Sequence, residues 1–500
     1  MAHQSELIAG NIEQYLKEHE NKEICRFITC GSVDDGKSTL IGRLLYDSKM
    51  IFEDQLASIE KDSKKSGTTG DKIDLALLVD GLASEREQGI TIDVAYRFFS
   101  TEKRKFIIAD TPGHEQYTRN MATGASTADL AIILIDARQG VLTQTKRHSY
   151  IASLLGIKNI IVAINKMDLV DFSEDRFEEI KDEYQKVIPY LPYYQNINFE
   201  YIPISALDGD NIVSNSSKCS WYKDKALMEL LDTIDITTNY PLQTTHFRMP
   251  VQYVSRPHLN FRGFCGTIAS GTISVGDHIT VLPSRKTSKV KEIILPSAVS
   301  SEELVVSSKN TTNYPLQTTH LAYAPMATTI TLEDEIDISR GDMIVKSDDI
   351  PDVSNKFSVM VVWMSEEKMI LNSNYIIKRA TSVINGSFKS IEYKKDINRF
   401  DEVKTNSLEL NDIAKCTLSL DRKMAVDPYN ENRYTGSFIV IDRYTNNTVG
   451  AGMIIESIVN SQSSIESSDY RLKTIDYTQT EKELNEFIRR NYPEWECKEI

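Results

Sequence analysis

The sequence predicts an α/β domain with a mostly parallel sheet, followed by two β-barrel domains. Three observations point to this fold class. A glycine-bounded loop joins an apolar run at 24–29 to a helical pattern that begins near Leu40. Further apolar runs follow as far as residue 204, each ending in polar residues, as buried parallel strands do. From about Phe247 the helical spacing gives way to short alternating runs, which are typical of β-barrels.

Length and charge suggest several globular domains and no nucleic-acid partner. The chain has 500 residues, and we expect domains at 1–245, 246–350 and 351–500. Lysine and arginine total 57 against 72 aspartates and glutamates, a net charge of −15. Such a balance argues against a surface that binds phosphate backbones.

Cysteine usage and hydropathy predict a cytoplasmic protein. The 6 cysteines form no C-x-x-C pair, which suits a reducing compartment and provides no metal-ligand spacing. The first residues are polar and acidic, unlike a secretory signal. Because no run approaches the roughly 18 apolar residues of a spanning helix, we expect no membrane association.

The loop at 31–38 fits the phosphate-loop pattern G-x-x-x-x-G-K-[ST] at each fixed position. Gly31 and Gly36 permit a tight turn that points N–H groups at phosphate oxygens, and the helix start adds partial positive charge. Lys37 would bind the β- and γ-phosphates, and Ser38 would offer a hydroxyl to Mg²⁺. The predicted phosphate-binding residues are Gly31, Ser32, Val33, Asp34, Asp35, Gly36, Lys37, Ser38 and Thr39.

A D-x-x-G motif follows the strand predicted at 105–109. Asp110 at the strand tip can hold Mg²⁺, and Gly113 offers an N–H that can approach a γ-phosphate closely. His114 is placed to orient a water for attack on that phosphate, although a lone histidine also fits a surface or core position. The predicted contacts from this motif are Asp110, Thr111, Pro112, Gly113 and His114.

The long charged connection at 50–92 is where a nucleotide-dependent switch is expected. Thr91 could reach Mg²⁺ and the γ-phosphate in the triphosphate state. A threonine that simply opens a strand fits the same position, and residue type does not separate the two. The candidate catalytic residues are Lys37, Thr91 and His114, and the candidate metal ligands are Ser38, Thr91 and Asp110.

A third motif, N-K-x-D, predicts base recognition after the strand at 159–164. The Asp168 carboxylate can accept both N1–H and N2–H of guanine. Adenine would leave that charge unpaired, at a cost of at least about 1–3 kcal/mol. After the strand at 201–204, a backbone N–H can donate to the guanine carbonyl. The predicted base-binding residues are Asn165, Lys166, Met167, Asp168, Ser205, Ala206 and Leu207.

These three motifs occur in order, each at the carboxyl end of an apolar strand. Ligands of open α/β sheets bind at that edge, so the motifs should form one pocket. The first domain is therefore predicted to be a P-loop GTPase domain that takes GTP and Mg²⁺.

With these motifs in place, the chain resembles translation-factor GTPases, in which DTPGH is followed by NKMD about 50 residues later. Asp35 and Ser38 stand where elongation factors typically carry His and Thr. The segments at 256–284, 331–344 and 433–453 are similar to one subfamily, the GTPase subunit of bacterial sulfate adenylyltransferase.

The resemblance implies a reaction coupled between two chains. A smaller, ATP-using subunit would join sulfate to the AMP part of ATP, giving adenosine 5′-phosphosulfate and diphosphate. GTP hydrolysis on the present chain would make that uphill step favourable. Such coupling requires a conformation that differs between the GTP and GDP states, for which 50–92 and 111–125 are the candidate segments.

Two further functions fit the motifs. An elongation-factor-like translation GTPase would bind charged tRNA, which the net charge of −15 disfavours. A stand-alone regulatory GTPase would purify without an enzymatic partner.

Outside the GTPase motifs, we expect short helices at 6–20 and 480–490 and a second barrel at about 355–458. The peptide TTNYPLQTTH occurs twice, at 237–246 and 311–320. A local duplication and a sequence artefact both explain it. We expect 297–321 to be a surface excursion that does not build the barrel core.

Overall fold

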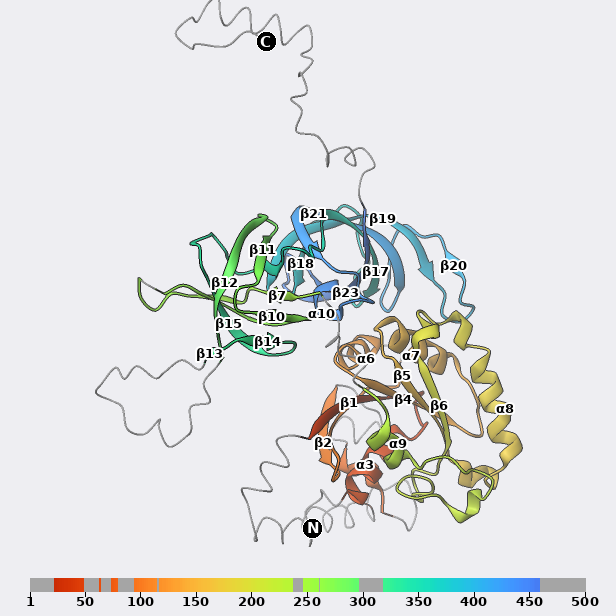
Figure 1. Ribbon diagram of the computed structural model, residues 1–500. Helices are drawn as coiled ribbons and strands as arrows, with labels where there is room; N and C mark the ends of the chain where they lie inside the picture. Colours follow the sequence, from red (N-terminus) through yellow and green to blue (C-terminus); the bar gives the residue numbers. More distant parts are fainter. Residues whose placement is uncertain are drawn as a thin grey trace, which may run out of the picture. The chain divides into compact units, whose positions relative to one another are not determined.

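The computed structural model describes residues 22–48, 63, 73–79, 94–114, 117–236, 246–259, 261–295 and 318–458 (Figure 1). All of them belong to one compact unit, 1–458. Several predictions lie outside the described residues: the helices at 6–20 and 480–490, Thr91, and most of both copies of the repeated peptide. The domain boundaries proposed at 245 and 350 stay predictions.

Six strands form the sheet of the first domain, in the order β2-β3-β1-β4-β5-β6 (Figure 1). Only the pairing of β2 with β3 is antiparallel, so the predicted mostly parallel sheet is confirmed. The strands are β1 (Glu23–Cys30), β2 (Ala95–Ser100), β3 (Arg104–Asp110), β4 (Leu130–Asp136), β5 (Asn159–Asn165) and β6 (Asn198–Pro203).

Helices cover both faces of this sheet and give it two apolar cores. Successive side chains of a strand point to opposite faces, so Ile132 packs in the core of α3 and α9 and Ile133 in that of α6 and α7. The α-helices are α3 (Lys37–Asp47), α6 (Thr118–Ala125), α7 (Thr143–Leu154), α8 (Glu174–Gln185) and α9 (Leu227–Thr233). The 3₁₀ turns are η1 (Leu75–Leu78), η3 (Met167–Val170), η4 (Ile188–Tyr190), η5 (Tyr194–Asn196) and η6 (Ser217–Cys219).

The first barrel consists of short antiparallel strands, and Gly271 and Gly276 take left-handed turns between them, with φ of 71° and 90°. Its strands are β7 (Arg248–Pro250), β8 (Tyr253–Ser255), β9 (Gly263–Thr267), β10 (Thr272–Ser274), β11 (His278–Leu282), β12 (Lys286–Ile294), β13 (Thr318–Thr319), β14 (Leu321–Tyr323), β15 (Ala327–Leu332) and β16 (Met343–Lys346).

One prediction about this barrel is corrected in part. We expected 297–321 to be a surface excursion, yet Thr318 and Thr319 pair with Ile294 and Ile293 as β13, and Leu321 begins β14. Backbone ladder bonds therefore bring the end of the stretch into the sheet. Its described side chains nevertheless stay outside the core, since none from 318 to 321 is buried.

The second barrel closes because β18 pairs with both β19 and β22. The order is β18-β22-β23-β17-β21-β19-β20. Its elements are β17 (Asp352–Trp363), β18 (Tyr375–Arg379), β19 (Ser382–Lys395), β20 (Glu402–Val403), β21 (Ile413–Val426), α10 (Arg433–Gly436), β22 (Ser437–Ile441) and β23 (Thr448–Ser457). The two barrels after the α/β domain confirm the predicted fold class.

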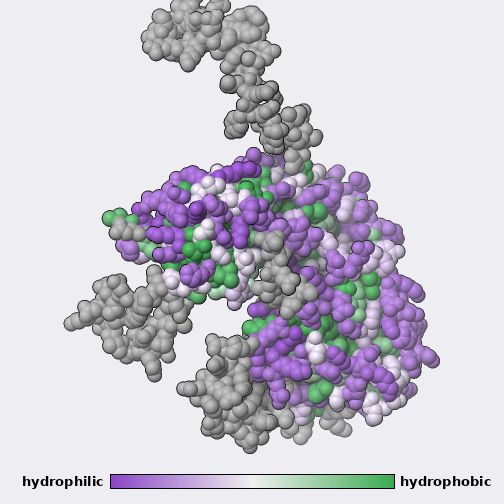
Figure 2. Space-filling model, viewed as in Figure 1, coloured by the Kyte–Doolittle hydropathy of each residue, from purple (hydrophilic) through white to green (hydrophobic). Residues whose placement is uncertain are grey.

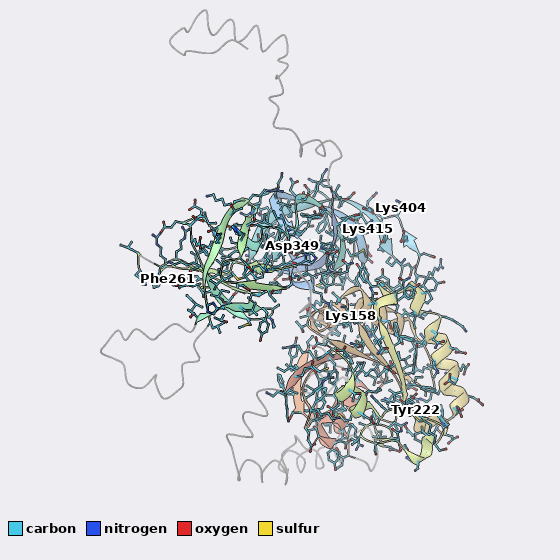
Figure 3. All side chains as sticks on the ribbon, in the orientation of Figure 1. Lys158, Tyr222, Phe261, Asp349, Lys404 and Lys415 are labelled. Atoms are coloured by element: carbon cyan, nitrogen blue, oxygen red, sulfur yellow. The ribbon has the colours of Figure 1, made fainter. Side chains whose placement is uncertain are left out.

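The visible face of the molecule is largely hydrophilic, with small scattered apolar areas (Figure 2). In Figure 3, Phe261 marks the turn between β8 and β9, Lys404 follows β20, and Lys415 lies on β21. Every helix among the described residues is too short or too polar to traverse a bilayer.

Candidate nucleotide site

The phosphate loop connects β1 to α3 and leaves the start of that helix open. Gly36 precedes α3 with a φ of 91°, a left-handed conformation that favours glycine. A β-carbon on Gly36 would lie 2.5 Å from Asn165 Nδ2, so the position leaves no room for a side chain. Within the described residues no side chain caps α3, whose first N–H groups are therefore available to an anion.

Lys37 is the first residue of α3, and its side chain is buried against the phosphate loop. Its Nζ donates to Ser32 O at 2.7 Å and to Gly31 O at 3.2 Å. Burial lowers the pKa of Lys37, and the neighbouring Asp35 carboxylate opposes that effect. A β-carbon on Gly113 would lie 2.5 Å from Nζ, so the lysine stands where the phosphate loop meets the D-x-x-G segment.

β3 carries Asp110 to the edge of the sheet beside β1. The parallel register pairs Asp110 with Thr29, whose Oγ1 donates to Asp110 Oδ1 at 3.4 Å. Thr111 Oγ1 donates to Thr29 O at 2.6 Å and fixes the start of the motif. His114 is half-buried, and its ring stands edge-on to Tyr117, with 6.1 Å between the centroids.

Asn165 joins the phosphate loop to the loop that follows β6. Its Nδ2 donates to Asp35 O at 2.7 Å, and its Oδ1 accepts from Ala206 N at 2.9 Å. The Ser205 N–H bonds within its own turn. Of the three amides at 205–207, the Leu207 N–H is thus the one that bonds to no other described residue and is open to a base carbonyl.

Asp168 lies in the first turn of η3 and is half-buried, next to the buried Met167. Lys166 precedes that turn with a φ of 62°, and its Nζ donates to Asp34 O in the phosphate loop. The described residues of all three motifs therefore lie at the carboxyl edge of one sheet, as the order of the motifs predicts.

Known proteins resemble this chain along its whole length. Residues 22–239 match the Elongation factor Tu GTP binding domain, and residues 356–455 match the family GTP-eEF1A C-terminal domain-like. The chain is 58% identical over 500 residues to the sulfate adenylyltransferase subunit 1 of Sulfurovum sp. (strain NBC37-1), with 100% of each chain covered. This chain belongs to the sulfate adenylyltransferase subunit 1 family.

Two further members of the family are similarly close to the chain. The subunit 1 of Aliarcobacter butzleri (strain RM4018) is 60% identical over 493 residues, 99% of this chain and 98% of the relative. That of Saccharophagus degradans (strain 2-40) is 56% identical over 500 residues, 100% of this chain and 99% of the relative.

In this member of the sulfate adenylyltransferase subunit 1 family, two residues that the motifs did not predict lie beside the predicted base-binding residues. They are Asp136 and Arg138. Asp136, at the end of β4, accepts from Arg138 Nε at 3.0 Å and Nη2 at 2.6 Å, and from Lys166 Nζ at 3.1 Å. Burial raises the pKa of Asp136, but the hydrogen bonds from Arg138 and Lys166 outweigh it and bring the pKa to about 2. Asp136 therefore holds Lys166 in place as a permanent anion. A carboxylate at the tip of an apolar strand was a signal that could have found it.

Arg43 is a third residue that the motifs missed. Its Nε donates to Ala206 O at 3.2 Å and its Nη2 to Leu207 O. Because Arg43 lies on α3, the helix that begins at the phosphate loop also positions the loop after β6. Arg43 and Ala206 are 163 residues apart, and no spacing in the sequence indicates their contact.

His148 is the fourth residue that the motifs did not predict. It lies on α7, is 1% exposed, and its Nδ1 accepts from Gly31 N at 3.1 Å. Burial, together with the charge of Lys37, lowers the pKa of His148 from 6.5 to about 3. The imidazole is therefore neutral at pH 7 and acts as a hydrogen-bond acceptor for the first glycine of the phosphate loop.

This histidine predicts a loss of stability in acid. The unfolded chain takes up a proton on His148 near pH 6.5 and the folded chain only near pH 3, so stability falls as the pH drops through that window. At pH 5 we expect the loss from this group to be about 2 kcal/mol. His148→Asn keeps an acceptor for Gly31 without the titration. Thermal unfolding of both proteins at pH 7.5 and pH 5 measures the difference, and an equal drop in the two would contradict it.

The donors at this edge suit a magnesium ion bound mainly by phosphate. Among the described residues, no three His, Cys, Asp or Glu side chains form a metal-binding group. Mg²⁺ in nucleotide sites takes one or two protein ligands beside phosphate oxygens and water. Ser38 in the first turn of α3 and the buried Asp110 are oxygen donors of that kind. The remaining candidate ligand, Thr91, lies outside the described residues.

Proposed function

We propose that this chain binds and hydrolyses GTP to drive sulfate activation on a second subunit. The observation that carries the proposal is the Asn165 side chain, which bonds both the phosphate loop at Asp35 and the base loop at Ala206. One residue thus joins the loop proposed to bind the phosphates to the loop proposed to bind the base. The match of 22–239 to the Elongation factor Tu GTP binding domain supports the same conclusion.

In this proposal the motif residues keep the roles that their chemistry suggests. Lys37 and the N–H groups at 31–39 bind the phosphates, and Asp168 and the Leu207 N–H recognise guanine. Ser38, Asp110 and Thr91 would hold Mg²⁺, which would neutralise charge on the phosphates when bound. His114 orients the attacking water, whose oxygen bonds to the γ-phosphorus as the bond to the β-phosphate oxygen breaks.

The work is done on another polypeptide. The relatives at 55–60% identity are called subunit 1 of sulfate adenylyltransferase, which implies at least one further subunit. We propose that the partner is a smaller, ATP-using subunit in the cytoplasm. It would displace diphosphate from ATP with sulfate, forming adenosine 5′-phosphosulfate, while GTP hydrolysis on this chain supplies the free energy. No role for nucleic acid or membrane is proposed.

The test is synthesis of adenosine 5′-phosphosulfate by the purified complex of this chain with its co-expressed smaller subunit. With ATP, sulfate and Mg²⁺ present, we expect product to accumulate when GTP is added and to stay at trace levels without it. A non-hydrolysable GTP analogue serves as the control and should not restore accumulation. Equal synthesis in guanine-free buffer would contradict the proposal, as would tight GTP-dependent binding of charged tRNA.

A further inference from the structure

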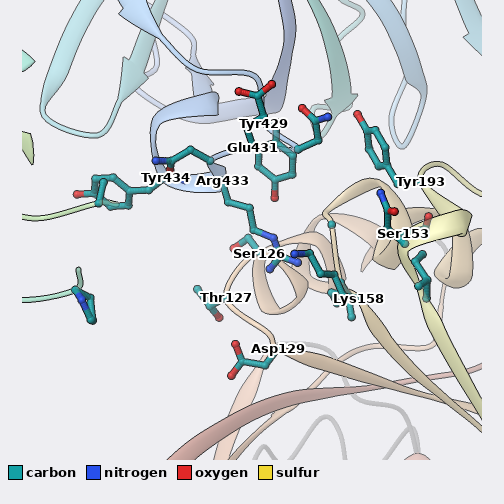
Figure 4. A pocket seen from close by; sticks show the side chains of 18 of the residues that line it. Ser126, Thr127, Asp129, Ser153, Lys158, Tyr193, Tyr429, Glu431, Arg433 and Tyr434 are labelled. Atoms are coloured by element: carbon teal, nitrogen blue, oxygen red, sulfur yellow. Dashed lines mark hydrogen bonds between the residues drawn. The ribbon is translucent and has the colours of Figure 1, made fainter. Parts of the chain in front are cut away.

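One short segment of the second barrel, residues 427–436, bonds to all three domains. It contains α10 and the loop before it. Figure 4 shows Tyr429 and Arg433 from this segment pointing toward the GTPase domain, with Arg433 near Ser126 and Lys158. A cavity of about 350 Å³ opens between them. Tyr429 is 3% exposed and packs in an apolar core that the second barrel shares with the GTPase domain, so the segment is held on this side by packing as well as by polar bonds.

Two of those bonds reach turns of the GTPase domain. Tyr429 Oη donates to Leu155 O at 3.0 Å, and Arg433 Nη1 donates to Ala128 O at 3.2 Å. Arg433 also packs on Gly156, where a β-carbon would lie 3.0 Å from Arg433 Nε. These turns precede β4 and β5, so they lie at the edge of the sheet opposite the nucleotide site.

Other bonds reach the first barrel. Asp427 accepts from Arg248 Nε at 2.9 and 3.2 Å, and Asn432 Nδ2 donates to Ser270 Oγ at 3.0 Å. Arg248 is 3% exposed, and Thr435 Oγ1 donates to the same Asp427 carboxylate at 2.6 Å. Because a buried charge is costly to leave unpaired, this side of the segment stays joined to the first barrel.

The contact between this segment and the GTPase domain is connected through α6 to residues 110–114, which we call the hydrolysis motif. A β-carbon on Gly124, near the end of α6, would lie 3.1 Å from Thr111 Cγ2 and 3.4 Å from Ala109 Cβ, so helix and motif pack closely. α6 begins shortly after His114 and ends at Ala125, three residues before the carbonyl that Arg433 contacts. Close packing at Thr111 is therefore connected, through α6, to the carbonyl of Ala128 that Arg433 contacts.

From these contacts we propose that segment 427–436 transmits the nucleotide state from the hydrolysis motif to both barrels, with Arg433 as its positioning residue. The inference rests on the proposed function, since it names the route by which hydrolysis reaches the rest of the complex. The physical path is Thr111 to Gly124, Ala128 to Arg433, and then Asn432 and Asp427 to the first barrel.

The test measures adenosine 5′-phosphosulfate formed per GTP hydrolysed by the complex of this chain with its smaller subunit. Arg433→Gln removes the charge and shortens the side chain, away from the nucleotide pocket. We expect GTP hydrolysis to stay within about twofold of the parent and product per GTP to fall by about tenfold, a typical coupling. Arg443→Gln, an exposed arginine of the same barrel, is the matched control and should leave the ratio unchanged.

Tyr429→Phe removes only the hydroxyl that bonds to Leu155 O and decides the question if Arg433→Gln does not fold. It should lower the same ratio by a smaller factor. An unchanged ratio in both variants would overturn the inference, and so would parallel losses of hydrolysis and synthesis. If the parent complex itself shows no dependence on GTP, the proposed function fails instead, so the two failures are distinguishable.

Discussion

Lys37→Ala should abolish GTP turnover while leaving the protein folded. In the proposed function the Lys37 ammonium is the positive charge that binds the β- and γ-phosphates, and alanine carries no such charge. We expect turnover to fall on the order of 10³-fold or more, since charged groups aimed at phosphoryl transfer contribute at least as much as a single oxyanion donor. Steady-state GTP hydrolysis at saturating GTP measures the effect.

The structure indicates why folding should survive this change. Burial lowers the pKa of Lys37, which means that the folded chain disfavours the charged form. Because the buried ammonium is disfavoured in the folded chain, we expect its removal to leave the unfolding temperature close to the parent value. Lys103→Ala, at an exposed position of the same domain, controls for loss of a lysine. Near-normal turnover in Lys37→Ala would defeat the loop assignment.

The motif residues were predictable because chain topology places them. A phosphate loop, D-x-x-G and N-K-x-D each follow an apolar strand, and the carboxyl ends of parallel strands share one edge. The place of Asp110 at a strand tip and of Asp168 just after a strand can be predicted without knowledge of side-chain packing. Thr91 lies outside the described residues, so its assignment stays a prediction.

The residues that support the motifs could not be found in the same way. His148 accepts from Gly31 across 117 residues, and Arg433 reaches Ala128 across 305. A single histidine on a helix or an arginine in a barrel loop has no spacing that distinguishes it from an ordinary surface or core residue. Such contacts follow from tertiary packing alone. Asp136 is different, because its place at the tip of β4 repeats the pattern that identified Asp110.

Asp168→Asn should change the nucleotide that the pocket prefers. In the proposed function the carboxylate accepts two N–H groups of guanine, and hydrogen bonds to a charged group contribute about 1.5–3 kcal/mol each. Their loss should weaken GTP binding by roughly 10²–10⁴-fold. Xanthine carries a carbonyl where guanine carries its amino group, so the asparagine amide can donate to it while its oxygen accepts from N1–H. Titration with GTP and xanthosine triphosphate measures both affinities.

The surroundings of Asp168 make this exchange a specific test. The positive charge of Arg138 interacts with Asp168 as well as with Asp136, so the neutral asparagine loses an electrostatic partner without losing its place in η3. Asp171→Asn, an exposed aspartate three residues on, is the matched control and should bind GTP as the parent does. Weaker binding of both nucleotides would indicate that the turn has been disturbed, whereas an unchanged preference for GTP would remove Asp168 from base recognition. Reversing the donor and acceptor at one edge of the base predicts tighter binding of xanthosine triphosphate, which a disturbed turn does not predict.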